Sequence, residues 1–502
     1  MIKRLLLILM GSQALLGAQT LVSEADSILY RFYPERYTTT YYLTSNPALL
    51  SEDLEDSGLK LSSWFNRSEG QFKPYLEPGD VVFVQPSASG KKSIDSNRVF
   101  KGSFGFQKQM RKDWHWVSTQ YMPFGMPFLL GDSATGATHY NGIALDARYA
   151  QRVTSRWYAG AEIDYYVDEG VKKVSPKPIS DHNAIRFHLG TAWIAAPRIT
   201  LGLSGAYRRY NEEIDYDRDK TNPYVSMIYK FRGYDFARVF NKDDETRYVK
   251  DDHFMGRLSM HYRHSPRSGC LLWGELAHQQ NVSRENPSIP RNEGTWTNRM
   301  GQVAFQGYHP ISVRWMASLS YGFERHHQES DHSIYDLIIS QAIVMNHSLR
   351  SGLRFDAART LKTNLELKLG FGSIEVLDNF CDVEWNSDQT VIGGMVGAEW
   401  IPHSRILMRF SAGWESLGNS SDYTIPVLHS DLSTQRLNDI YYYLAESSQW
   451  MLTGTIEYRS ARWGTFRLNV GYRSQTVKDD DFFTDCHRRN LNLQLDYLVQ
   501  VF

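Results

Sequence analysis

The stretch 361–371, LKTNLELKLGF, decides the fold of this chain. Its odd positions carry leucine and phenylalanine with one threonine. Its even positions carry lysine, asparagine and glutamate with one glycine. Successive side chains of a β-strand point to opposite faces, so this period of two predicts a strand with one apolar and one polar face.

The same alternation recurs from residue 59 to the C-terminus, for example around Trp315, Leu349, Phe410 and Leu468. No repeat of fixed period marks the blades of a propeller. We predict strands near 59–67, 97–110, 114–122, 140–152, 156–167, 183–194, 199–210, 252–263, 270–279, 299–308, 312–324, 344–356, 361–373, 389–400, 405–415, 448–459, 463–474 and 488–502.

The links between these strands alternate in length. Short links such as 111–113, 153–155 and 402–404 are followed by long polar links near 122–140, 168–182, 211–251, 280–297, 325–343, 374–388, 416–446 and 475–487. Short turns at one end, long loops at the other and an even strand number are typical of outer-membrane barrels, and about 10 residues suffice for a tilted crossing. The sequence predicts an all-β fold, a transmembrane antiparallel up-and-down β-barrel of about 18 strands, with 16 or 14 as alternatives. The segment 224–231 also alternates, but we assign it to the 211–251 loop because it would break the up–down order.

Aromatic residues gather at many predicted strand ends, as girdles at the lipid interface would. They are Trp114, Trp116, Tyr121, Trp157, Tyr165, Tyr207, Tyr321, Trp400, Trp414, Trp463 and Tyr472. A secreted soluble β-sandwich also buries alternating faces and is the alternative fold. The girdles and the asymmetric turns favour the membrane barrel.

Composition excludes two other classes. The formal charge is −1, which gives no basic field for nucleic acid. The mean hydropathy is −0.45 and no apolar run of about 18 residues follows the N-terminus, which excludes a multi-helix transporter. Cys270, Cys381 and Cys486 are odd in number and have no CxxC spacing, so we expect neither a disulfide framework nor a zinc site.

The N-terminus has the features of an export signal. Lys3 and Arg4 precede an apolar stretch over 5–16, and Gly17-Ala18 supplies small residues for cleavage. We predict residues 1–18 as a signal peptide, 19–58 as a periplasmic or lumenal N-terminal plug segment and 59–502 as the barrel. The expected location is the cell outer membrane.

The segment 19–58 carries the triplet Asn46-Pro47-Ala48 just before the first predicted strand. The triplet resembles the N-terminal hatch motif of the long-chain fatty acid transporter family, in which a short segment plugs the lumen and opens a lateral path for hydrophobic substrates. A plain Asx-Pro turn is the structural alternative. The predicted strand count exceeds the fourteen of that family, and the whole chain resembles the uncharacterised outer-membrane barrel families of the domain-of-unknown-function type.

Charged residues fall on the faces opposite the apolar ones. Arg at mid-membrane costs about 2–4 kcal/mol when it faces lipid, so these side chains should face the lumen. The candidate lumen-lining residues are Glu162, Asp164, Arg208, Arg257, Arg314, Glu324, Arg350, Arg354, Glu366, Arg409, Arg467, Arg473 and Asp496. They could line an aqueous channel, in which the excess of arginine favours anionic or polar solutes, or form a salt-bridge lattice that fills the interior.

Candidate chemical sites are few. Asp215, Asp217 and Asp219 alternate as in a calcium loop but lack its glycine and final glutamate. The loop residues His326, His327, Glu329, Asp331 and His332 match no strong metal motif, and Gly131-Asp132-Ser133 has no partner Asp-x-x-His to complete an esterase. We predict no catalytic residues, cofactor or metal.

Three functions follow from the barrel. The first is a channel or transporter for an unidentified solute, which we favour. The second is a docking barrel whose long outer loops bind a surface partner such as a lipoprotein. The third is an outer-membrane hydrolase. Expected partners are outer-membrane lipid and the barrel-assembly machinery, because Phe502 resembles the terminal aromatic that barrels present to it, although Phe502 is out of phase with the apolar face.

Overall fold

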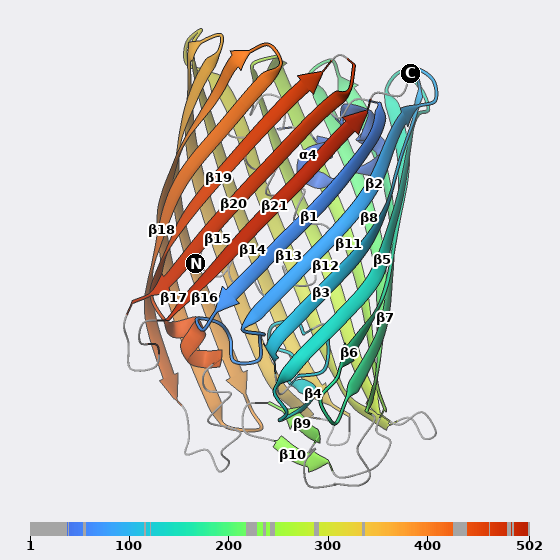
Figure 1. Cartoon of the computed structure of the whole chain (residues 1–502), viewed down its shortest axis with the longest axis vertical. Coiled ribbons are helices and arrows are strands. Elements are labelled where there is room, and N and C mark those ends of the chain that lie inside the picture. The colour runs from blue at the N-terminus through green and yellow to red at the C-terminus, as the bar shows by residue number, and fades with distance from the viewer. Residues whose placement is uncertain are drawn as a thin grey trace.

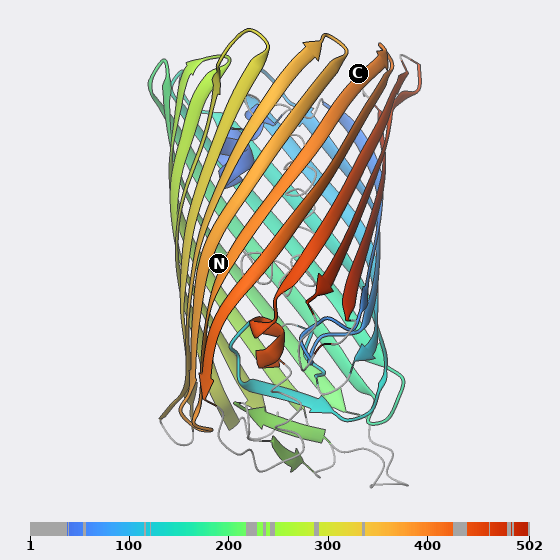
Figure 2. The same ribbon diagram turned by 90° about the vertical axis from the view of Figure 1, so that its left-hand side faces the viewer.

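The chain forms a closed antiparallel β-barrel of 18 strands, which confirms the predicted architecture. The structure is a computed structural model that describes residues 38, 40–53, 57–114, 117–120, 122–216, 228–233, 237–240, 246–285, 291–333, 337–424, 439–460, 462–478, 483 and 486–499. Each wall strand pairs with its neighbours in chain order, and β1 pairs with β21 to close the barrel. Figures 1 and 2 show strongly tilted strands, with the short turns at the upper end and the longer loops at the lower end.

The wall strands are β1 (Gly58–Gly70), β2 (Asp80–Ser93), β3 (Arg98–Trp114), β5 (Gly136–Arg152), β6 (Trp157–Lys172), β7 (Pro178–Ala196), β8 (Ile199–Tyr216), β11 (Thr246–Ser265), β12 (Ser268–Glu285), β13 (Arg291–Pro310), β14 (Trp315–His332), β15 (Leu337–Ala358), β16 (Leu361–Asp378), β17 (Val383–His403), β18 (Ile406–Thr424), β19 (Ser447–Ser460), β20 (Gly464–Val477) and β21 (His487–Val499). Two short helices, α4 (Thr40–Thr44) and η1 (Pro47–Glu52), precede them. A second sheet joins β4 (Phe128–Asp132), β9 (Ile228–Arg232) and β10 (Ala237–Phe240).

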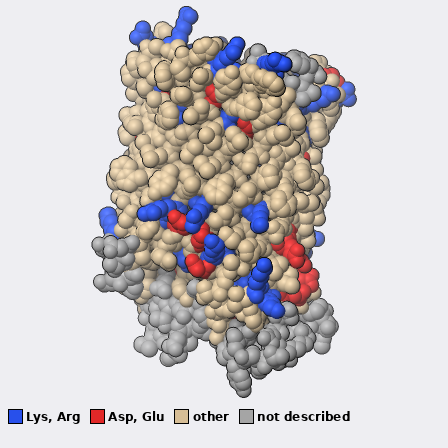
Figure 3. Space-filling view, in the orientation of Figure 1, with Lys and Arg blue, Asp and Glu red and all other residues tan. Residues whose placement is uncertain are grey.

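The two faces of the wall differ as the alternation predicts. On β16, Leu365, Leu367 and Phe371 are exposed on the outer face, whereas Asn364 and Lys368 are buried on the inner one. Figure 3 shows an outer band with few charged residues between two ends that carry Lys, Arg, Asp and Glu. Of the predicted girdle residues, Trp157, Tyr165, Tyr321, Trp400, Trp414, Trp463 and Tyr472 are exposed.

The strands are longer than we predicted, and several predicted loops are therefore too long. β15 has 22 residues and β17 has 21, about twice what a tilted bilayer crossing needs. The predicted loop 374–388 reduces to the turn 379–382 because β16 and β17 continue their pairing to Asp378 and Val383. The strands therefore extend beyond the bilayer at the loop end.

The prediction missed the wall strand β2 and included a false strand at 114–122. These two errors cancel, which is why the predicted number of 18 strands is nevertheless correct. β2 contains Pro86, which cannot donate to a ladder, and the bridges between β2 and β3 skip Gln85 and Pro86. The predicted strand 114–122 and turn 111–113 are wrong, because β3 continues through to Trp114. Trp114 is buried, and its indole N–H donates to Leu76 O at 2.9 Å, so it is not a girdle residue.

Loops fold into the barrel at its long-loop end. One buried cluster joins Leu76, Trp114, Leu129, Phe231 and Trp296, from three loops and two wall strands. A second joins inner-wall residues of β15 to β17 with Ile440 of the helical turn 439–444. The described part of the 224–231 segment, residues 228–231, was rightly kept out of the wall, since β9 pairs only with β4 and β10 among the described strands. Within the described part of the chain, no helix has the length and apolar character to cross a membrane.

Candidate functional site: the N-terminal segment and the charged inner wall

Residues 40–53, called here the N-terminal segment, lie inside the barrel near its short-turn end (Figures 1 and 2). Ala48, Leu49 and Leu50 are buried against the small inner-wall residues Ala150 of β5 and Ala192 of β7. Small wall side chains leave room for the backbone of the segment. The segment is thus packed against one side of the barrel, over β3 and β5 to β7.

Two glycines form a cradle beneath the Asn46-Pro47-Ala48 triplet. Gly160 of β6 and Gly190 of β7 are directly opposite each other in the sheet. A Cβ on Gly160 would lie 2.5 Å from the backbone nitrogen of Ala48, and one on Gly190 would overlap the side chain of Asn46. Any larger residue at either position would displace the triplet. A glycine inside a strand pattern often marks such a close backbone approach, which is the sequence signal that could have found the cradle.

Asn46 connects the segment to the wall through its side-chain amide. Its Nδ2 donates to the backbone oxygens of Thr191 on β7 at 3.1 Å and of Leu203 on β8 at 3.5 Å. Its Oδ1 accepts from the backbone N–H of Ala48 at 3.0 Å and caps η1. The triplet therefore forms the Asx-type cap that was the structural alternative, and the same side chain also binds the wall.

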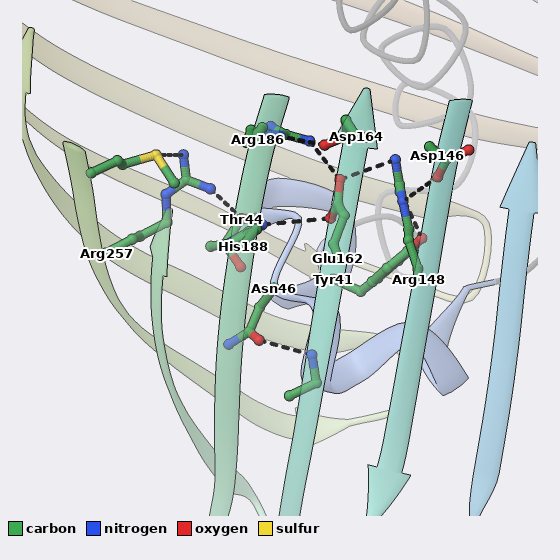
Figure 4. A network of polar contacts seen from close by, with 12 residues as sticks. Tyr41, Thr44, Asn46, Asp146, Arg148, Glu162, Asp164, Arg186, His188 and Arg257 are labelled. Carbon is green, nitrogen blue, oxygen red and sulfur yellow. Dashed lines mark hydrogen bonds and ion pairs between the residues drawn. The ribbon is translucent and has the colours of Figure 1, made fainter. Parts of the chain in front are cut away.

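Charged wall residues surround the segment (Figure 4). Arg257 of β11 donates to the backbone oxygen of Thr44 and pairs with Glu275 of β12. Arg148 of β5 donates to the Tyr41 hydroxyl at 3.4 Å. These contacts place Arg257 and Arg148 between the segment and the other charged residues of the wall.

Behind these contacts lies a connected set of ion pairs. Glu162 of β6 accepts from Arg186 at 2.5 Å and lies 3.4 Å from Arg148. Arg186 also pairs with Asp164 at 2.6 Å, and Arg148 with Asp146 at 3.0 Å. Glu162 is almost fully buried, so the two guanidinium groups replace its lost hydration.

The two ends of the segment are also held. Asp53 pairs with Lys101 of β3 at 2.9 Å, and its backbone oxygen accepts from Lys91 of β2 at 2.6 Å. At the other end, burial raises the pKa of the Tyr41 phenol to about 12. Tyr41 therefore stays a neutral hydrogen-bonding group at physiological pH.

Most of the predicted lining residues lie on the inner faces of wall strands and pair with opposite charges. Arg208 pairs with Asp251, Arg354 with Asp356, Arg409 with Glu399, Arg467 with Glu457, and Lys60 with Asp496. Glu324 is hydrogen-bonded to His326 at 2.7 Å. Arg350 lies opposite Lys368 in the β15–β16 register, and Lys368 bonds Glu415 across Gly393 of β17. Glu366 and Arg473 lie on β16 and β20. The wall thus carries a paired charge lattice.

Two of our placements need correction. Arg314 lies exposed in the turn 311–314, because β14 begins only at Trp315, so it is not part of the wall. His326, His327, Glu329, Asp331 and His332 lie on β14 rather than in a loop. His326 and His332 point to one face of the strand and His327, Glu329 and Asp331 to the other, so the five side chains cannot converge on one ion. Among the described residues no group of three or more His, Cys, Asp or Glu is placed to hold a metal ion. Asp217, Asp219, Phe502 and the predicted signal peptide lie outside the described residues.

Sequence reasoning missed a second set of buried charges at the loop end. Lys230 and Arg232 of β9 pair with Glu285 of β12 and Glu293 of β13. Asp132 of β4 pairs with Lys172 of β6 at 2.8 Å. These pairs attach the small β4–β9–β10 sheet to the wall. Their partners are about 40 to 60 residues apart in sequence, which no local pattern reveals.

Comparisons with known proteins place the chain in a family. Solved structures with similar folds include the siderophore receptor PiuA from Acinetobacter baumannii, with 8% identity, a TM-score of 0.42, and coverage of 88% of this chain and 82% of that one. The CymD monoaromatic hydrocarbon channel has 9% identity, a TM-score of 0.30, and coverage of 92% and 93%. No curated protein matches. The model of a family of unknown function, DUF6850, matches residues 47–498, and the chain belongs to that family.

Proposed function

We propose that this protein is an outer-membrane transport barrel in which the N-terminal segment controls the passage of a polar solute. The observation that carries the proposal is the docking of residues 40–53 inside the barrel on a fitted glycine cradle. A segment that only tethered the chain would not require Gly160 and Gly190 beneath Asn46 and Pro47.

The nature of the contacts supports movement of the segment. Asn46, Tyr41 and Thr44 are held by hydrogen bonds to the wall, and only Asp53 contributes an ion pair. A typical hydrogen bond contributes about 0.5–1.5 kcal/mol net. Burial of Leu49 and Leu50 adds to these bonds. Since none of the described residues 40–53 is part of the 18-stranded sheet, the segment can leave the wall without breaking a strand pairing of the barrel.

The inner wall supports a polar solute. The residues next to the segment are charged and joined in ion pairs; they are Arg148, Glu162, Asp164, Arg186 and Arg257. A charged wall attracts water and ions and disfavours apolar molecules. We therefore propose that the paired lattice lines the route of the solute, and that the solute is a hydrophilic small molecule.

Single-channel recording tests this function. The mature protein would be inserted into planar bilayers and compared with a variant lacking residues 19–58. We expect low conductance in the complete protein and steady conductance after the deletion. Absence of conductance in both forms, with both migrating as heat-modifiable folded barrels on gels, would overturn the proposal.

A specific surface feature favours a second candidate, the docking barrel. Leu337 and Ile338 at the start of β15 and Phe380 in the turn 379–382 are exposed beyond the bilayer. Exposed apolar groups that cluster on a surface mark interaction sites. Replacing all three residues with serine should release a surface lipoprotein in co-purification if this candidate holds, and should leave conductance unchanged if transport holds.

A further inference from the structure

The outer wall carries a hollow within its apolar band, independent of the proposed route through the lumen. It lies over β7, β8, β11 and β12 and has a volume of about 620 Å³. At its centre Gly205 of β8 and Gly256 of β11 are directly opposite each other. A Cβ on Gly256 would meet no atom within 4 Å, so the space above this glycine is open.

Large side chains wall the hollow on both sides. Leu189 of β7 pairs with Gly205, and Leu276 of β12 pairs with Gly256. Leu189 is 65% exposed and Leu276 is 74% exposed, which makes them ridges on either side of a furrow two strands wide. In a bilayer we expect such a furrow to be filled by an apolar group, because the residues that line an empty void lose their dispersion contacts on that side.

The chemistry of the outer face changes stepwise from this furrow toward the loop end. The next row of the sheet consists of Phe187, Tyr207 and Phe254, with the Tyr207 and Phe254 rings 4.8 Å apart. Aromatic rows of this kind lie at the level where hydrocarbon meets headgroups. The furrow therefore lies just inside the leaflet on the loop side.

A charged trio follows: Asp252 and Arg209 are opposite each other in the next row, and Lys250 lies one row further toward the loop end. Asp252 of β11 accepts from Arg209 of β8 at 2.9 Å and from Lys250 at 2.9 Å, and it also accepts from the Tyr207 hydroxyl at 2.6 Å. Arg209 and Lys250 are each 43% exposed. Two cations share one carboxylate, so the trio has a net positive charge at headgroup level. Arginine and lysine in this position bind phosphate well.

A second hollow continues along the same strands toward the loop end. It has a volume of about 850 Å³ and extends sideways onto β3, β5 and β6. Apolar residues such as Phe106 and Val282 line it together with the polar Asn183, Asn211, Glu169, Asp181, Glu213 and Arg284. Amide and carboxylate groups can donate to or accept from the hydroxyl groups of a sugar. Apolar furrow, cationic trio and polar hollow thus follow one another along four strands.

We propose that this surface binds a phosphorylated, acylated glycolipid of the loop-side leaflet. One acyl chain lies in the furrow over Gly205 and Gly256, a phosphate contacts Arg209 and Lys250, and the sugar occupies the polar hollow. A second copy of this chain is disfavoured as the occupant, because its own lipid-facing wall offers neither a phosphate nor a sugar for the trio and the polar hollow.

Native mass spectrometry of the complete mature protein in detergent tests the site, with lipid A and phosphatidylglycerol as probes. We expect retention of one lipid A in preference to phosphatidylglycerol. The double variant Gly205→Leu/Gly256→Leu should reduce retention at least about fivefold by filling the furrow, and Arg209→Gln/Lys250→Gln should reduce it by a similar factor.

The matched control is Gly454→Leu on β19, on the same face as the exposed Leu452 and Ile456 and nine strands away around the barrel. It should leave retention unchanged. Equal retention of the two lipids, loss of lipid A in the control as well, or a dimer in place of bound lipid would each overturn the proposal. Heat-modifiable migration on gels verifies that each variant is folded.

Discussion

Gly190→Ala should release the N-terminal segment from the wall, because the added methyl group would occupy the position of the Asn46 side-chain oxygen and lie 2.9 Å from Pro47 Cδ. The neighbouring strand backbone cannot yield, since β7 is paired on both sides by β6 and β8. The triplet must therefore shift away from its cradle.

The expected magnitude follows from the contacts that depend on this position. Asn46 would lose its bonds to Thr191 and Leu203, at about 0.5–1.5 kcal/mol each. Leu49 and Leu50 would lose part of their burial, which contributes about 1.5–3 kcal/mol for each complete side chain. Together we expect about 2–4 kcal/mol, which raises the population of the released segment roughly 30- to 700-fold.

Thiol labelling measures this population. Leu49→Cys, in a background with Ser at the three native cysteine positions, is buried when the segment is docked and reacts with a maleimide when it is released. The matched control is Gly256→Ala, which adds the same methyl group to the outer face where it meets no atom. Equal labelling rates in Gly190→Ala and Gly256→Ala would refute the cradle as the device that holds the segment.

Three further predictions concern the charges. Glu415→Gln leaves buried Lys368 without its carboxylate and should lower the free energy of unfolding in urea by about 3–5 kcal/mol. The control Glu446→Gln breaks an exposed pair with Lys478 and should lower it by about 1 kcal/mol or less. Equal losses in the two variants would contradict this prediction. Asn46→Ala should raise the labelling rate of Leu49→Cys as Gly190→Ala does, and an unchanged rate would show that packing alone holds the segment. Burial raises the pKa of the Asp132 carboxyl, although the charge of Lys172 lowers it. In Lys172→Met we therefore expect Asp132 to stay buried while it is protonated at acid pH, and to be expelled into water as it ionises when the pH rises through its raised pKa. Proteolysis of the 115–135 loop should then become faster with increasing pH, and a pH-independent rate would count against this.

The strand alternation was readable from the sequence because it is a local property. Leu365, Leu367 and Phe371 face lipid and Asn364 and Lys368 face inward as soon as the segment is extended. Local rules fail where tertiary packing decides instead. β2 pairs with β1 and β3 despite Pro86 because the barrel must close, and Trp114 is buried because loops fold inward over it.

The candidate site was only half visible for a related reason. The triplet Asn46-Pro47-Ala48 and the inward arginines stand out in the sequence, but their partners do not. Gly160 and Gly190 are more than 100 residues away from the triplet, and Asp251 and Glu399 are partners of Arg208 and Arg409 only through the register of the sheet.

The sequence by itself therefore determined the all-β wall, its two faces and the direction of its longer loops, since each depends on residues that are neighbours along the chain. Only the tertiary structure decided where the N-terminal segment docks, which charges are neutralised in pairs, and where glycines hollow the outer wall. These depend on which strands become neighbours when the barrel closes, and closure is set by pairings such as that of β1 with β21, over 400 residues apart.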